Sequence, residues 1–99
     1  MESKIKYIRQ LVKELVAGFI PVTRLNGICR EAEQFLRENE NLLLKKEETW
    51  NPLSMRLFQQ GCAVLESVAS RRLFTSQELS ALRDNTKVFL EDTKEFDNG

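Results

Sequence analysis

The apolar residues of this chain recur at steps of three and four along most of its length, which is the period of an α-helix with one buried face. The first such stripe comprises Ile5, Ile8, Leu11, Val12, Leu15, Val16 and Phe19. Charged side chains fall on the opposite face of that segment: Lys4, Lys6, Arg9, Lys13 and Glu14. No sustained alternation of apolar and polar residues indicates a strand. The chain is therefore predicted to belong to the all-α class.

Three further stripes follow the first. The second comprises Leu25, Ile28, Cys29, Ala32, Phe35, Leu36, Leu42 and Leu43. The third comprises Leu53, Leu57, Phe58, Gly61, Val64, Leu65 and Val68, and the fourth comprises Leu79, Leu82, Thr86, Phe89 and Leu90, extended by Phe96. They predict helices over about 3–19, 23–44, 52–71 and 76–95. Asn39 occupies an apolar position of the second stripe, so that helix is expected to bend, fray or stop there.

Local signals mark the helix ends. Ser3 is predicted to cap the first helix, which Gly18 and Pro21 then end. Asn51 is predicted to cap the third helix, with Pro52 at the first helical position, where its missing N–H costs nothing. Thr75-Ser76-Gln77-Glu78 has the pattern of a capping box. Trp50 with Met55, and Phe74 with Leu79, have the spacing of hydrophobic staples, although Trp50 could also anchor a partner.

Four amphipathic helices joined by short turns bury all four stripes when neighbouring helices run antiparallel. We therefore expect an antiparallel, up-down-up-down four-helix bundle. Ninety-nine residues, without an internal repeat or a Pro/Gly/Ser-rich linker, are expected to form one domain over residues 1–99.

Composition argues against most enzyme classes. The sequence has no His, which excludes zincins, Ser-His-Asp triads and Cys-His proteases. Paired carboxylates such as Glu31/Glu33 and Glu91/Asp92 are interpreted as solvated helix faces or ends. Fifteen basic residues balance fifteen acidic ones, and no basic stripe with interleaved aromatics indicates nucleic-acid binding. We expect a binding protein without catalytic activity, cofactor, metal, small-molecule substrate or nucleic-acid partner.

Two cysteines, Cys29 and Cys62, are interpreted as small apolar side chains of a helical core. A single disulfide or a redox-sensing thiol stays an alternative. The longest apolar run near the N-terminus, Leu15–Val22, is far shorter than the ~20 residues needed to cross a bilayer, and it has no signal-peptide pattern. A cytoplasmic location is expected.

The C-terminal half resembles a known family. Asn51-Pro52-Leu53-Ser54-Met55-Arg56-Leu57, Arg71-Arg72-Leu73-Phe74-Thr75 and Gln77-Glu78-Leu79-Ser80-Ala81-Leu82 are similar to the immunity proteins of class IIa, pediocin-like bacteriocins, of the enterocin A immunity type. Pro52-Leu53, Arg56-Leu57 and Phe74-Thr75 stand at that family's Pro-Leu-x-x-Arg-Leu helix start and Phe-Thr turn. The resemblance covers residues 51–90.

This resemblance implies a four-helix self-protection protein that defends a producer cell against its own pore-forming peptide. It implies action from the cytoplasm, in part at the inner face of the membrane. The implied partner is the mannose phosphotransferase permease, the bacteriocin's membrane receptor, in complex with bacteriocin. The C-terminal half is implied to set which bacteriocin is resisted.

The candidate partner-binding surface is basic. Arg71 and Arg72 stand at the C-terminal end of the third predicted helix, where the helix macrodipole favours cations, so they have a structural explanation as well. The functional interpretation is an exposed corner, extended by the basic residues of the last helix: Arg71, Arg72, Phe74, Arg83, Lys87 and Lys94. Two other classes of function stay open: a helical regulatory adaptor of the antitoxin or anti-repressor type, and a small enzyme or metal carrier.

Overall fold

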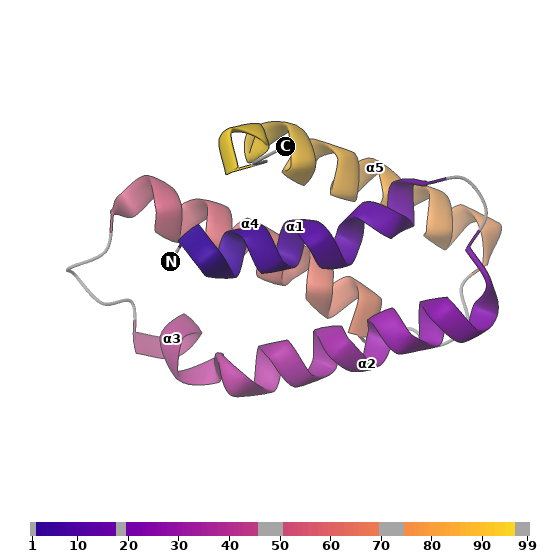
Figure 1. The fold of residues 1–99 in the computed structure, drawn as a ribbon, viewed down its shortest axis with the longest axis horizontal. Helices are drawn as coiled ribbons and strands as arrows, with labels where there is room; N and C mark the ends of the chain where they lie inside the picture. The colour runs from indigo at the N-terminus through magenta and orange to yellow at the C-terminus, as the bar shows by residue number, and fades with distance from the viewer. Residues whose placement is uncertain (1, 18–19, 46–50, 70–74, 97–99) are drawn as a thin grey trace.

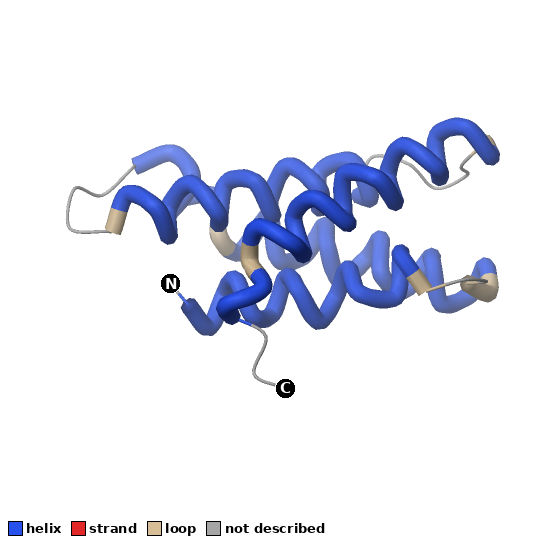
Figure 2. Tube along the Cα trace, turned by 90° about the horizontal axis from the view of Figure 1, so that it is seen from above, coloured by secondary structure: helices blue, strands red, loops and turns tan. Residues whose placement is uncertain are grey.

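A computed structural model of the chain describes residues 2–17, 20–45, 51–69 and 75–96. Within these ranges it holds five α-helices, one short 3-10 helix and no β-strand, which confirms the all-α class (Figures 1 and 2). The elements are α1 (Glu2–Val16), α2 (Val22–Glu38), α3 (Glu40–Lys45), α4 (Pro52–Ala69), α5 (Ser76–Asp92) and η1 (Lys94–Phe96).

Helices α1 and α4 pack against each other at the centre of the fold. α2 packs mainly against α4, whereas α5 packs against both α1 and α4. The beginnings of α1 and α4 lie at one end of the molecule, and those of α2 and α5 lie at the other end (Figure 1). η1 contacts both α5 and α1, so the last described residues lie against the first helix.

The core is built from the predicted stripes. Phe58 and Phe89 are its largest fully buried side chains. Around them lie buried apolar residues of all four long helices: Ile5, Ile8, Leu11, Val12 and Leu15 of α1; Ile28, Cys29, Ala32 and Phe35 of α2; Leu57, Cys62, Val64, Leu65 and Val68 of α4; and Leu82 of α5. Leu53 departs from the prediction, because 56% of it is exposed at the first turn of α4.

Several helix boundaries differ from the prediction. α1 begins at Glu2, so Ser3 lies inside the helix and does not cap it, and α1 ends at Val16, not at residue 19. The last helix ends at Asp92 and is followed by η1 instead of continuing to residue 95. α4 ends at Ala69; residues 70–71 of the predicted third helix, like Gly18 and Phe19, lie outside the described residues.

The predicted 23–44 helix is two helices, interrupted at Asn39. The Asn39 side chain is buried. Its Nδ2 and its backbone N–H both donate to the carbonyl of Phe35, at 2.8 and 3.0 Å. Its Oδ1 accepts from Lys4 Nζ at 2.6 Å. The Phe35 carbonyl at the end of α2 thus has two donors, and Lys4 satisfies the buried oxygen of the Asn39 side chain. The expectation that the helix is disturbed at Asn39 is confirmed.

The predicted caps of α4 and α5 are confirmed. Asn51 Oδ1 accepts from the N–H groups of Leu53 and Ser54, at 2.9 and 3.4 Å. Thr75 Oγ1 accepts from the Glu78 N–H at 3.1 Å, and a Glu78 carboxylate oxygen accepts from the Thr75 N–H at 3.3 Å. Trp50 and Phe74 lie outside the described residues, so both staples stay predictions.

Candidate functional site

The six residues of the predicted basic surface divide into two groups. Arg71, Arg72 and Phe74 belong to the connection between α4 and α5 and lie outside the described residues. The other three can be placed. Arg83 and Lys87 stand one turn apart on α5, so they share a side of that helix. Lys94 belongs to η1, beyond the end of α5.

Arg83 is engaged inside the protein. Its side chain is half-buried, and its Nε donates to the carbonyl of Leu15 at 3.0 Å. Leu15 lies in the last turn of α1, where carbonyls have no partner within the helix. Arg83 therefore joins the first helix to the last and complements the negative end of the α1 dipole.

Lys87 and Lys94 are exposed. Lys94 Nζ lies 3.2 Å from a carboxylate oxygen of Glu91, and both side chains are more than 70% exposed. An exposed pair of this kind contributes little to stability. Lys87 and Lys94 are therefore the accessible cations among the described members of the predicted surface.

Sequence reasoning missed the role of Arg9. It was predicted to lie on the polar face of the first helix, but only 4% of it is exposed. One guanidinium nitrogen, Nη1, donates to the Leu90 carbonyl at 2.7 Å and to Thr93 Oγ1 at 2.6 Å. The Thr93 hydroxyl donates in turn to the Phe89 carbonyl at 2.7 Å. Because α1 packs against both α4 and α5, its buried arc is wider than the apolar stripe alone indicates.

Lys4, like Arg9, is a basic residue of α1 that bonds to the end of another helix. Besides its bond to Asn39, its ammonium lies 6.0 Å from the centre of the Phe35 ring. Tyr7 stacks on the same ring with 5.1 Å between centroids. Burial, reinforced by the negative charges of Glu31 and Glu38, raises the pKa of Tyr7. The basic side chains of α1 thus complete the ends of two other helices, α2 and α5.

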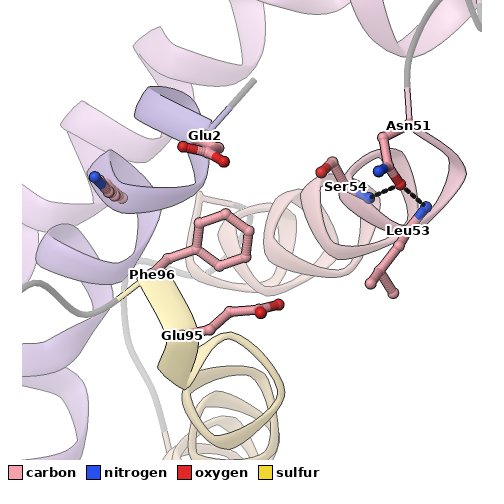
Figure 3. A pocket seen from close by; sticks show the side chains of 7 residues that line it. Glu2, Asn51, Leu53, Ser54, Glu95 and Phe96 are labelled. Atoms are coloured by element: carbon pink, nitrogen blue, oxygen red, sulfur yellow. Dashed lines mark hydrogen bonds between the residues drawn. The ribbon is translucent and has the colours of Figure 1, made fainter.

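An open cavity of about 310 Å³ lies where the beginnings of α1 and α4 meet η1. Figure 3 shows the Phe96 ring between the Glu2 and Glu95 carboxylates, facing the first turn of α4. The complete lining is Glu2, Lys6, Asn51, Leu53, Ser54, Glu95 and Phe96. The sequence does not indicate this cavity, because its lining residues lie far apart along the chain, at positions 2–6, 51–54 and 95–96.

A second open cavity of about 240 Å³ lies between α4 and α5. Its lining is uncharged: Gln60, Ala63, Val64, Ser67, Asn85 and Val88. Gln60 Nε2 donates to Asp92 Oδ2 at 2.9 Å, which links the two helices near this cavity.

The two cysteines are free and buried, as predicted for core positions. Burial, aided by the negative charge of Glu66, raises the pKa of Cys62 to about 12. The Cys62 thiol is therefore protonated at neutral pH and is a poor nucleophile and metal ligand. Among the described residues no group of three or more His, Cys, Asp or Glu side chains could hold a metal ion. Within those residues no helix combines the length and apolar character needed to span a bilayer.

Comparisons with protein-family models, with curated proteins and with solved structures find no match for this chain.

Proposed function

We propose that this protein is an immunity protein that protects a bacteriocin-producing cell from a pore-forming, pediocin-like peptide. The observation that carries the proposal is the resemblance of residues 51–90, in which Pro52-Leu53 and Phe74-Thr75 have the family's spacing. The capped starts of α4 and α5 support it, because Asn51 and Thr75 act as helix caps at those two points.

The proposed architecture is an antiparallel, up-down-up-down four-helix bundle. In this scheme α1, α2, α4 and α5 are the four helices, and α3 is a short continuation of the second. The alternation of helix beginnings between the two ends of the molecule supports this topology (Figure 1). A bundle of this kind offers helix ends and turns as binding surfaces.

The proposed partner is the mannose phosphotransferase permease with bacteriocin bound, approached from the cytoplasmic side of the membrane. The proposed contact surface is the α4–α5 connection, with Arg71, Arg72 and Phe74, together with the exposed Lys87. The exposed Lys94 is a proposed contact at the other end of α5, a helix length of about 25 Å away. Arg83 has a different proposed role: through its bond to the Leu15 carbonyl it holds α5 against α1.

The test is expression of the protein inside a bacteriocin-sensitive cell. The expected result is increased resistance to one or a few members of a panel of pediocin-like bacteriocins, with no protection when the protein is added outside. Replacing Arg71 and Arg72 together with Ala is expected to weaken protection, because the positive corner is removed. The free energy of unfolding is expected to change by less than about 1 kcal/mol, since the proposal makes these arginines part of a contact surface and exposed charges contribute little to folding.

A matched control is the double variant Arg30→Ala and Arg37→Ala, which removes two exposed arginines of α2. It is expected to keep full protection. Full protection by the Arg71/Arg72 variant at normal expression would exclude these arginines from the contact surface. No protection against any bacteriocin of the panel would contradict the proposal, and a stable protein partner in a pull-down would then favour a regulatory adaptor.

A further inference from the structure

We propose that the cavity at the junction of α1, α4 and η1 binds a basic, amphipathic peptide segment of a partner protein. The site shares no residue with the proposed contact surface, although Lys94, the further proposed contact, precedes Glu95 in η1. The beginnings of α1 and α4 lie at the opposite end of the molecule from the end of α4 and the beginning of α5 (Figure 1). Its dimensions suit a side chain and its neighbours, since small binding sites begin at roughly 300 Å³.

The first reason for a basic, amphipathic ligand is that two apolar side chains and two carboxylates line the same cavity. Phe96 is half-buried and lines the cavity. Leu53, one of the few large apolar side chains exposed in the described part of the chain, lines it too. Glu2 and Glu95 flank the ring (Figure 3). An aromatic face attracts a cation within about 6 Å, and flanking carboxylates strengthen that attraction.

The second reason is that the carboxylates are not already used. Among the described residues, neither Glu2 nor Glu95 takes part in an ion pair or a side-chain hydrogen bond. Lys6 also lines the cavity, so the charged lining carries two negative charges and one positive charge. The starts of α1 and α4 add the positive ends of two helix dipoles, so the net charge of the lining is small. A cationic group is therefore favoured by its position between the Glu2 and Glu95 carboxylates and beside the Phe96 ring, not by the net charge of the lining.

The third reason is that the wall carrying Phe96 is held in place. The Phe96 N–H donates to the Thr93 carbonyl at 2.9 Å, and the Thr93 hydroxyl is bonded to the buried Arg9. On the opposite wall Asn51 fixes the first turn of α4 by accepting from the Leu53 and Ser54 N–H groups. A preformed site loses less conformational entropy on binding than a flexible one.

The apolar and acidic residues of the cavity together determine which side chains of a partner would fit. A lysine or arginine fits between the two carboxylates and over the ring, and a neighbouring apolar side chain fits against Leu53 and Phe96. The same two carboxylates disfavour an anionic segment between them. The expected occupant is therefore a protein segment in which basic and apolar residues adjoin.

The test uses two capped tetrapeptides, Leu-Lys-Lys-Leu and Leu-Glu-Glu-Leu, titrated into the full-length ¹⁵N-labelled protein. The lysine peptide is expected to shift the backbone amide signals of Ser54 and Phe96 with a dissociation constant in the millimolar range or below. The glutamate peptide is expected to shift neither signal. The double variant Glu2→Gln and Glu95→Gln is expected to weaken binding of the lysine peptide at least fivefold, and Phe96→Leu at least threefold.

The matched control is the double variant Glu31→Gln and Glu40→Gln, which makes the same change in net charge at exposed positions of α2 and α3. It is expected to bind the lysine peptide within twofold of the unchanged protein. Three results would each overturn the proposal: no shift at 5 mM peptide, equal binding of both peptides, or equal weakening by the two double variants. Circular dichroism of each variant separates loss of binding from loss of fold.

Discussion

At the scale of single residues, Gly61 determines how closely three helices approach. A Cβ atom built at this position of α4 would lie 2.9 Å from two ring carbons of Phe89 and 3.0 Å from Ile8 Cδ1. Both neighbours are fully buried, so neither side chain can swing into solvent. Glycine within a helix costs about 1 kcal/mol relative to alanine, and here it permits the contact among α1, α4 and α5.

Gly61→Ala is therefore expected to lower the free energy of unfolding by about 1 kcal/mol. Overpacking costs about 1–3 kcal/mol and outweighs the gain of about 1 kcal/mol in helix propensity. Urea unfolding measures the change. The control is Gly27→Ala in α2, where the nearest atom to the new Cβ is Arg24 Nη1 at 3.8 Å. That substitution is expected to stabilise the protein by about 0.5–1 kcal/mol. Stabilisation by both substitutions would contradict the packing at Gly61.

At the scale of elements, the beginning of α5 depends on the reciprocal bonds between Thr75 and Glu78. Thr75→Ala removes the acceptor of the Glu78 N–H and is expected to lower the free energy of unfolding by about 1 kcal/mol. Thr75→Ser keeps the hydroxyl and is expected to retain most of the stability. Ser76→Ala, at the neighbouring exposed position, is expected to change stability by less than about 0.5 kcal/mol. Equal losses of unfolding free energy in Thr75→Ala and Ser76→Ala would show that the capping box does not stabilise α5.

The sequence was sufficient for features whose partners are close along the chain. The caps at Asn51 and Thr75 could be predicted because each needs only residues within three positions. Arg9 could not, because its acceptors are 81 and 84 positions away. The same reason applies to the candidate sites. The residues near Arg83 in the sequence do not indicate its bond to Leu15, 68 positions away. The residues near Phe96 do not indicate that Glu2 lines the same cavity.

At the scale of the whole molecule, basic side chains connect one helix to the C-terminal end of another. Lys4 reaches the end of α2 at Asn39, Arg9 reaches the end of α5 at Leu90 and Thr93, and Arg83 reaches the end of α1 at Leu15. Arg9 and Arg83 each bond a backbone carbonyl in the last turn of the other helix, whereas Lys4 bonds the side-chain oxygen of Asn39, the residue that caps α2. All three cations lie at the negative end of a helix dipole.

Arg9→Met is expected to lower the free energy of unfolding by about 2–3 kcal/mol. Methionine keeps much of the apolar stem but removes charge-assisted hydrogen bonds and leaves a buried carbonyl and hydroxyl without this donor. Amide hydrogen exchange at Thr93 and Phe96 is expected to accelerate more than exchange in the middle of α4. Arg30→Met, at an exposed position of α2, is the control and is expected to change stability by less than about 0.5 kcal/mol. Equal effects of the two substitutions would contradict the structural role of Arg9.

The packing of α1 against α5 also bears on how the protein is made. The ribosome synthesises α1 before α5, yet Arg9 and the Leu15 carbonyl have their partners on α5. Until α5 has been synthesised, the apolar face of α1 lacks one of the helices that cover it. Domains fold as units once their parts are available, and exposed apolar surface before that point invites aggregation. The nascent chain is therefore expected to complete its fold only after α5 has left the ribosome, and part of the apolar face of α1 stays uncovered until then.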